Sequence, residues 1–105
     1  MSEAEQLIEK LAQEVEGSNA KGEDILVFTL STCQWCKKCK RYLKDKDMKY
    51  RFIDVDKIDP QDKAKIIKYL REHYDERISY PFLVCEKGVV VGYNPEKYRK
   101  ILEDE

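Results

Sequence analysis

The feature that most constrains this chain is an apolar run that leads directly into a pair of cysteines. Residues 25–30 read ILVFTL, and Cys33 and Cys36 follow almost at once. A short, nearly continuous apolar run is typical of a strand buried on both faces, and such strands are usually central and parallel. Residues 34–46 then read as a helix. The sequence therefore predicts a central strand that ends at the cysteines, where a helix begins.

Helices and strands alternate along the rest of the chain. Apolar residues at helical spacing predict an amphipathic helix over residues 3–16, with a capping box from Ser2 to Glu5 and Gly17 as its end. The first two strands and their helix should form a right-handed crossover unit, to which a hairpin adds two strands. The other expected elements are a strand over residues 50–55, a helix over 58–73 with Pro60 in its first turn, a hairpin turning at 86–88, and a helix from Asn94 to Leu102.

Length and composition limit the class of protein. The chain has 105 residues, 42% hydrophobic and 39% charged, which indicates a folded, soluble domain with a well-charged surface. The net charge of −1 disfavours a nucleic-acid binder. No apolar run has the length of a membrane span, and the acidic N-terminus does not read as a signal peptide, so we expect a cytoplasmic protein. Cysteines there are more often catalytic or metal-binding than structural.

The position of Cys33 favours thiol chemistry. At a helix N-terminus the backbone N–H groups have no internal partners and the helix dipole is positive, so a thiolate gains hydrogen bonds and favourable field. Cys36 follows one turn later, which brings two sulfurs within disulfide reach, with Cys33 exposed and Cys36 more sheltered. Cys33 can then attack a substrate disulfide, and Cys36 can resolve the mixed disulfide.

Other chemistry stays open at this stage. The alternative function is a metal-binding module that holds iron–sulfur or zinc through Cys33, Cys36 and Cys39. Cys39 and Cys85 fit small core residues, although Cys39 could also be a third redox thiol. His73 fits an ordinary residue at a helix end.

Two stretches carry a resemblance to a known family. The segment LVFTLSTCQWCKKCKRYL resembles the first strand and active-site helix of glutaredoxins, and ISYPFLVCEKGVVVGYN resembles their later segment. The resemblance, over residues 25–102, implies a thioredoxin fold for residues 25–105, an α/β fold with a four-stranded mixed sheet flanked by helices. The N-terminal helix (1–17) and a linker (18–24) are additions to it.

The same resemblance implies roles for the site residues. Cys33 would be the nucleophile, Cys36 the resolving thiol and Pro81 a cis-proline facing them, with no tightly bound cofactor. The backbone of Tyr80 could pair with an extended substrate, because the proline that follows has no N–H to compete. The implied activity is thiol-disulfide exchange with disulfide-bearing proteins.

Several positions depart from the family pattern in ways that weaken a glutathione site. Leu30 stands where the family has a lysine, Gln34 where it has proline, and Ser79 where it often has threonine. The family's glycine pair with a following aspartate is reduced to residues 92–94, Gly-Tyr-Asn. We therefore expect a protein dithiol reductase as the electron donor, of the thioredoxin reductase or ferredoxin-thioredoxin reductase type, rather than glutathione.

Three surface features admit two interpretations each. Trp35 is either a substrate contact beside the sulfurs or a packing residue at the helix edge. The N-terminal helix either packs on its own domain or mediates dimerisation or partner docking. A basic run is either a solvated helix face or a docking surface for an acidic reductase; it comprises Lys37, Lys38, Lys40, Arg41 and Lys44.

Overall fold

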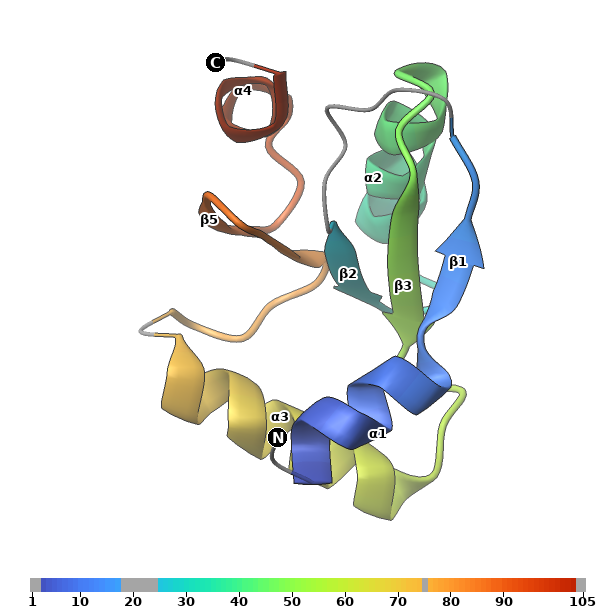
Figure 1. The fold of residues 1–105 in the computed structure, drawn as a ribbon, viewed down its shortest axis with the longest axis vertical. Helices are drawn as coiled ribbons and strands as arrows, with labels where there is room; N and C mark the ends of the chain where they lie inside the picture. The colour runs from blue at the N-terminus through green and yellow to red at the C-terminus, as the bar shows by residue number, and fades with distance from the viewer. Residues whose placement is uncertain (1–2, 18–24, 75, 104–105) are drawn as a thin grey trace.

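The computed structural model describes residues 3–17, 25–74 and 76–103 as a sheet covered by helices on both faces (Figure 1). The expected linker at 18–24 and Ser2 of the expected capping box lie outside the described residues. Among the described residues no helix is long and apolar enough to span a membrane. The elements in chain order are α1 (Glu3–Leu11), β1 (Gln13–Val15), β2 (Leu26–Thr29), α2 (Gln34–Asp45), β3 (Tyr50–Asp54), α3 (Pro60–His73), β4 (Phe82–Cys85), β5 (Gly88–Val91), α4 (Pro95–Tyr98) and the π-helical turn η1 (Arg99–Glu103).

The sheet places the predicted central strand at its centre. Its strand order is β1-β3-β2-β4-β5, with β2 and β3 parallel and the other neighbours antiparallel. Phe28 of β2 lies opposite Ile53 on one side and Phe82 on the other. The expectation of a mixed sheet built from a βαβ unit and a hairpin is confirmed.

The sheet has five strands rather than the four expected, because the predicted first helix is too long. The helix ends at Leu11, and residues 13–15 pair antiparallel with β3, Val15 opposite Tyr50. Without β1, this edge of β3 would expose unpaired backbone groups. Gly17 then passes close to the next turn: a Cβ there would lie 2.4 Å from the backbone carbon of Met48. This close approach, rather than the end of a helix, requires the glycine.

Alternating side chains of the strands build a separate core on each face of the sheet. Val27 and Leu83 face α2 and the C-terminal helices, whereas their neighbours Phe28 and Phe82 face α1 and α3. We call these the α2 face and the α3 face. The buried side chains of the α2 face are Ile25, Val27, Cys39, Leu43, Met48, Tyr50, Leu83, Val90, Tyr98 and Leu102. Those of the α3 face are Ile8, Phe28, Ile53, Val55, Ile66, Leu70 and Phe82.

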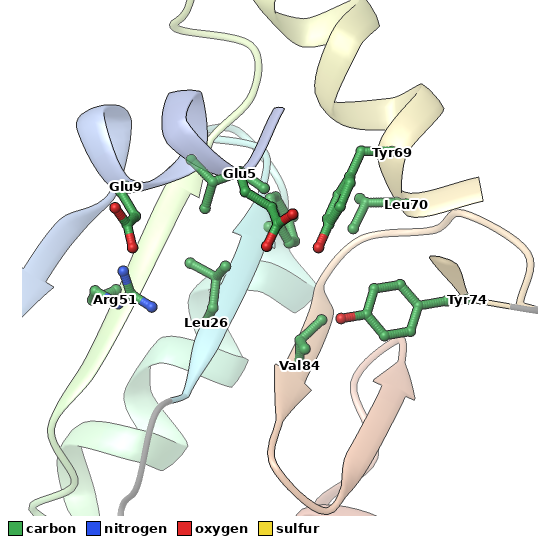
Figure 2. A pocket seen from close by; sticks show the side chains of 10 residues that line it. Glu5, Glu9, Leu26, Arg51, Tyr69, Leu70, Tyr74 and Val84 are labelled. Atoms are coloured by element: carbon green, nitrogen blue, oxygen red, sulfur yellow. The ribbon is translucent and has the colours of Figure 1, made fainter. Parts of the chain in front are cut away.

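The N-terminal helix packs on its own chain. Ile8 is buried against the α3 face, and Glu3 forms an ion pair with Lys65 of α3. An open cavity of about 210 Å³ lies between α1, α3 and the sheet. In Figure 2, Glu5, Tyr69 and Tyr74 extend toward this space, and Glu9 points toward Arg51. The structure thus agrees with the interpretation that α1 covers the sheet.

Side-chain caps begin two of the helices, at Asp59, which was not predicted from the sequence, and at Asn94, which was. Asp59 accepts a hydrogen bond from the backbone N–H of Gln61 at 2.8 Å, with Pro60 in the first turn of α3. Asn94 accepts one from the N–H of Lys97 at 3.1 Å at the start of α4. The C-terminal helical segment therefore starts where the sequence indicated.

Candidate active site

The turn after β2 delivers Cys33 to the start of α2. The N–H of Cys33 donates to the carbonyl of Leu30 at 3.1 Å, which closes the turn. Cys33 has extended backbone angles, φ −83° and ψ 122°, as a residue that caps a helix should. Its carbonyl accepts from the N–H of Lys37 at 3.1 Å, the first hydrogen bond of the helix. The chain thus passes from β2 through a short turn to the N-terminus of α2, with Cys33 as the capping residue.

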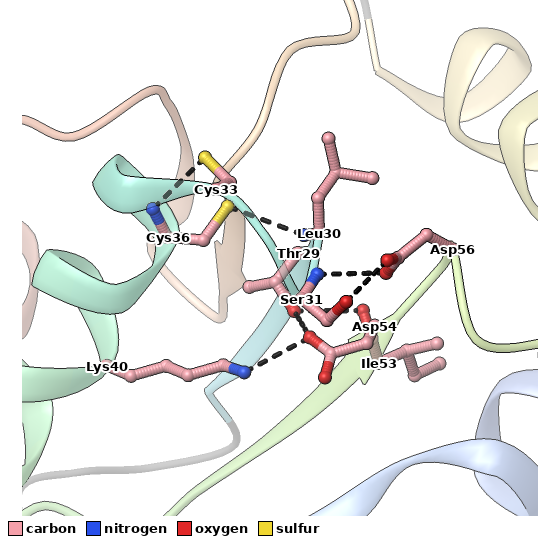
Figure 3. A network of polar contacts seen from close by, with 9 residues as sticks. All are labelled: Thr29, Leu30, Ser31, Cys33, Cys36, Lys40, Ile53, Asp54 and Asp56. Atoms are coloured by element: carbon pink, nitrogen blue, oxygen red, sulfur yellow. Dashed lines mark hydrogen bonds and ion pairs between the residues drawn. The ribbon is translucent and has the colours of Figure 1, made fainter.

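The two cysteines meet at this helix N-terminus, both as free thiols. The N–H of Cys36 donates to the Cys33 sulfur at 3.3 Å (Figure 3). Cys33 is half-buried, whereas the side chain of Cys36 is 1% exposed. The relative burial expected from the sequence is confirmed. The Cys33 sulfur is the accessible one, and it already accepts a backbone hydrogen bond that would stabilise a thiolate.

Cys36 is more deeply buried than Cys33, and this burial changes the pKa of its thiol. Burial raises the pKa of the Cys36 thiol from 9.0 to about 12, and negative charge on Cys33 acts in the same direction. The N–H of Leu30, which donates to the Cys36 sulfur at 3.5 Å, opposes this only in part. Cys36 is therefore a neutral thiol at neutral pH, and loss of the charge on Cys33 would remove one of the lesser causes that raise its pKa.

The loop before β4 carries the expected cis-proline. The Tyr80–Pro81 peptide bond is cis, and the carbonyl of Pro81 accepts from the N–H of Gly92 at 2.8 Å. Burial raises the pKa of the Tyr80 hydroxyl, and charge on Cys36 would raise it further. Of the two cysteines, it is Cys36 whose charge acts on the Tyr80 hydroxyl. The cis bond expected at Pro81 is confirmed, whereas the pairing of the Tyr80 backbone with a substrate stays a prediction.

Trp35 lies on the surface of α2, between the two cysteines in sequence. Its side chain is 55% exposed and stacks on Tyr93, with ring centroids 6.0 Å apart and planes at 27°. The ammonium of Lys38 sits 4.6 Å from the centroid of the Trp35 ring. Trp35 therefore presents an open aromatic surface beside the site.

A polar network below the turn was not predicted from the sequence. Thr29 and Asp54 lie opposite each other on the parallel strands, and the Thr29 hydroxyl bonds to the Asp54 carboxylate. Lys40 reaches the same carboxylate from α2 at 3.1 Å (Figure 3). The acidic residues at the end of the second strand could have indicated this network, because parallel strands end at the same edge of a sheet and so bring Asp54 next to Thr29. The network ties α2 to both central strands.

Asp56 fixes the turn itself. Its carboxylate accepts from the N–H of Ser31 at 2.9 Å and also from the Ser31 hydroxyl. These two hydrogen bonds lower the pKa of Asp56. The segment between β2 and Cys33 is therefore anchored to the chain that follows β3.

The other sulfur and imidazole groups lie away from this site. Cys39 is 0% exposed in the α2-face core, and burial raises its thiol pKa from 9.0 to about 11. Cys85 is half-buried at the border of that core. His73 ends α3, where its Nδ1 lies 3.0 Å from the carbonyl of Tyr69. Within the described ranges, no three His, Cys, Asp or Glu side chains are placed to share a metal ion.

A strand that runs into a helix-capping Cys-x-x-Cys, in a mixed sheet with a cis-proline before β4, is typical of redox proteins of the thioredoxin fold. The family model for glutaredoxin matches residues 25–90, and the chain belongs to the glutaredoxin family.

Individual relatives agree with this placement. The chain is 29% identical over 79 residues to a glutaredoxin-like 8.6 kDa protein of the rubredoxin operon of Clostridium pasteurianum, covering 75% of this chain and 97% of the relative. The glutaredoxin structure from Methanosarcina mazei Go1 superposes with a TM-score of 0.74 at 24% identity, over 88% of this chain and 87% of that one. The structure of a thioredoxin-like protein, BC3987, gives a TM-score of 0.62 at 32% identity, over 75% of this chain and all (100%) of that one.

Proposed function

We propose that this chain reduces protein disulfides by dithiol exchange, with Cys33 as nucleophile and Cys36 as resolving thiol. The observation that carries the proposal is the unequal pair of thiols. One sulfur is accessible and accepts a backbone N–H, and the other is buried beneath it as a neutral thiol. Family membership supports thiol-disulfide exchange in general.

The exchange runs in two steps. The Cys33 thiolate attacks one sulfur of the substrate disulfide, forming a mixed disulfide and releasing the other substrate sulfur as a thiolate. Charge on Cys33 has then been lost, which lowers the barrier to deprotonating Cys36. Cys36 gives up its proton and attacks the Cys33 sulfur as a thiolate, and the second substrate sulfur leaves as a thiolate that takes up a proton. Two electrons pass from the protein to the substrate, which leaves a Cys33–Cys36 disulfide.

We further propose that a protein dithiol reductase, rather than glutathione, regenerates the dithiol. Leu30 is half-buried and apolar, so it offers no charge to a glutathione carboxylate. Tyr93 is engaged with Trp35, and the Asn94 side chain caps α4. The thioredoxin-like name of one similar structure points the same way.

The alternative of a metal module has less support. It needs the Cys39 sulfur as a ligand beside Cys33 and Cys36, but Cys39 is enclosed in the core with Leu43 and Tyr98. A metal-loaded form would carry stoichiometric iron or zinc after anaerobic purification, which elemental analysis measures directly.

The test compares electron donors for insulin reduction. We expect thioredoxin reductase or ferredoxin-thioredoxin reductase to sustain turnover, and glutathione with glutathione reductase to sustain little. Leu30→Lys should raise the glutathione-supported rate, because it supplies a cation at the rim of the site, and Leu30→Met is the uncharged control. Equal turnover of the wild-type protein with glutathione would contradict the proposed donor. Loss of insulin reduction with every donor would contradict the proposed activity.

A further inference from the structure

One side of the site carries a group of outward-facing cations. Lys37, Lys38 and Arg41 are exposed, and their spacing places them on one face of α2 next to Gln34. Together these four side chains line a shallow hollow of about 230 Å³. We call this surface the cationic hollow. It begins at Gln34, the residue directly after the nucleophile.

These cations differ from Lys40 on the same helix. Lys40 turns inward, where it pairs with Asp54 and lies 3.9 Å from the ring centroid of Phe52. In the described part of the chain, no ion pair is recorded for Lys37, Lys38 or Arg41, and the first turn of α2 holds no acidic residue. The chain as a whole has a net charge of −1, so this positive charge is a local feature of one helix face.

The cationic hollow continues into the aromatic surface. Lys38 lines the hollow and also sits over the Trp35 ring, which stacks on Tyr93. Tyr93 follows Gly92, whose N–H holds the carbonyl of the cis-proline Pro81. A polypeptide placed against the Pro81 loop would therefore meet an aromatic surface and then, along α2, a row of cations.

We propose that this combined surface selects disulfides in acidic polypeptide segments, an inference that rests on the proposed function. Acidic residues near the reacting half-cystine would lie against Lys37, Lys38 and Arg41, and an apolar residue would cover Trp35. Complementary charge around a reacting centre raises the association rate, and added salt removes the gain. The dithiol exchange itself is unchanged, with the pre-reduced protein supplying both electrons.

The test is a single-turnover reaction of pre-reduced protein with matched cystine peptides. Glutamate, glutamine or lysine flanks the half-cystine in the three peptides. At low salt we expect the second-order rate constant for the glutamate peptide to exceed that for the lysine peptide by about tenfold or more. The ratio should fall toward one at about 1 M salt.

Charge reversal tests whether the cationic hollow causes this preference. The double variant Lys38→Glu, Arg41→Glu should reduce the lysine peptide fastest. The control double variant Lys63→Glu, Lys68→Glu makes the same charge change on α3 and should still reduce the glutamate peptide fastest. Trp35→Ala should slow all three peptides. Equal rates for all peptides in the wild-type protein, or a preference that survives the double variant, would overturn the inference while leaving the dithiol activity intact. If the protein reduces none of the three peptides, the proposed function is refuted instead.

Discussion

Different helices cover the two faces of the central sheet: α2 and the C-terminal helices cover one face, and α1 and α3 cover the other. The two faces also differ in how they contact the site. The core of the α2 face includes the buried Cys39, Tyr50 and Tyr98, whereas the α3 face is built from aliphatic residues with Phe28 and Phe82. The α3 face also keeps a cavity of about 210 Å³ beneath α1 (Figure 2). A chain of specific contacts through Tyr98 connects the α2 face to the candidate active site, whereas the α3 face meets the site where Leu30 and Tyr80 pack on its core.

Tyr98 is the centre of that connection. Its hydroxyl donates to the carbonyl of Gly92 at 2.8 Å, and the Gly92 N–H in turn donates to the carbonyl of Pro81 at 2.8 Å. The Tyr98 ring packs edge-on against Tyr93, with centroids 6.0 Å apart. We therefore expect changes in the α2-face core to alter both stability and the site, and changes beneath α1, at the far end of the other core, to alter mainly stability.

The largest expected effect is at the sulfurs. We expect Cys33→Ser to abolish insulin reduction, because Cys36 is buried and neutral. Cys36→Ser should instead accumulate a mixed disulfide with substrate, since the first step is intact and the second is lost. Intact-mass measurement of the reaction detects that adduct. Cys85→Ser is the matched control and should keep full activity; full activity of Cys36→Ser would show that the assigned roles are wrong.

The next effect separates the two cores by stability. Leu43 is 0% exposed in the α2 face, and Ile8 is 6% exposed beside the cavity of the α3 face. We expect Leu43→Ala to lower the free energy of unfolding by about 3 kcal/mol and Ile8→Ala by about 2 kcal/mol or less, because the second site already has open space. Urea denaturation measures both. At temperatures where both variants are folded, Ile8→Ala should retain wild-type activity; a slower Ile8→Ala protein would show that the α3 face also supports the site.

A smaller effect should follow from one hydroxyl. Tyr98→Phe leaves the Gly92 carbonyl without its donor and should lower the free energy of unfolding by about 1 kcal/mol. It should also slow reduction of substrate, because Gly92 holds the Pro81 carbonyl. Tyr74→Phe removes a hydroxyl at the open cavity of the α3 face and is the matched comparison (Figure 2). Equal rates of reduction for the two variants would argue against the connection through Tyr98.

The last expected effect is a pH dependence of stability, which is confined to alkaline pH. Burial raises the pKa of Cys39 from 9.0 to about 11, so the unfolded chain loses this proton first as pH rises. The stabilising contribution of the neutral thiol is complete below about pH 9 and is lost as pH rises toward about 11. Reduced Cys39→Ala should therefore lose less stability than the reduced wild-type protein over this range. Parallel urea midpoints from about pH 8 to pH 10.5 would contradict this account.

The sequence predicted the central part of the fold better than its edges. The apolar run before Cys33, Pro60 in the first turn of α3 and the cap at Asn94 act through local chemistry, so β2 and the starts of α3 and α4 were predictable. The strand β1 was missed because Val15 fits a helical period as well as a strand. Residues 13–15 form a strand because the edge of β3 is free to pair with them, and that edge exists only in the folded chain.

The same distinction holds for the site. The spacing of Cys33 and Cys36 is local, and their difference in burial followed from their places in the first turn of the helix. The Trp35–Tyr93 stack and the contact of Asp54 with Thr29 join segments that are distant in the chain. Their formation depends on strand register and on where the C-terminal segment returns, and neither can be obtained from residue spacing alone.

The most direct test of the central claim is a redox titration in glutathione buffers, read by differential alkylation and mass spectrometry of all four cysteines. We predict that Cys33 and Cys36 are protected together in a single disulfide, that Cys39 and Cys85 stay reduced, and that no glutathione adduct accumulates. The disulfide should stay closed at cytosolic glutathione potentials, on the order of −220 to −320 mV, until a protein reductase is added. A stable glutathione adduct on Cys33, or a disulfide that includes Cys39, would contradict the account.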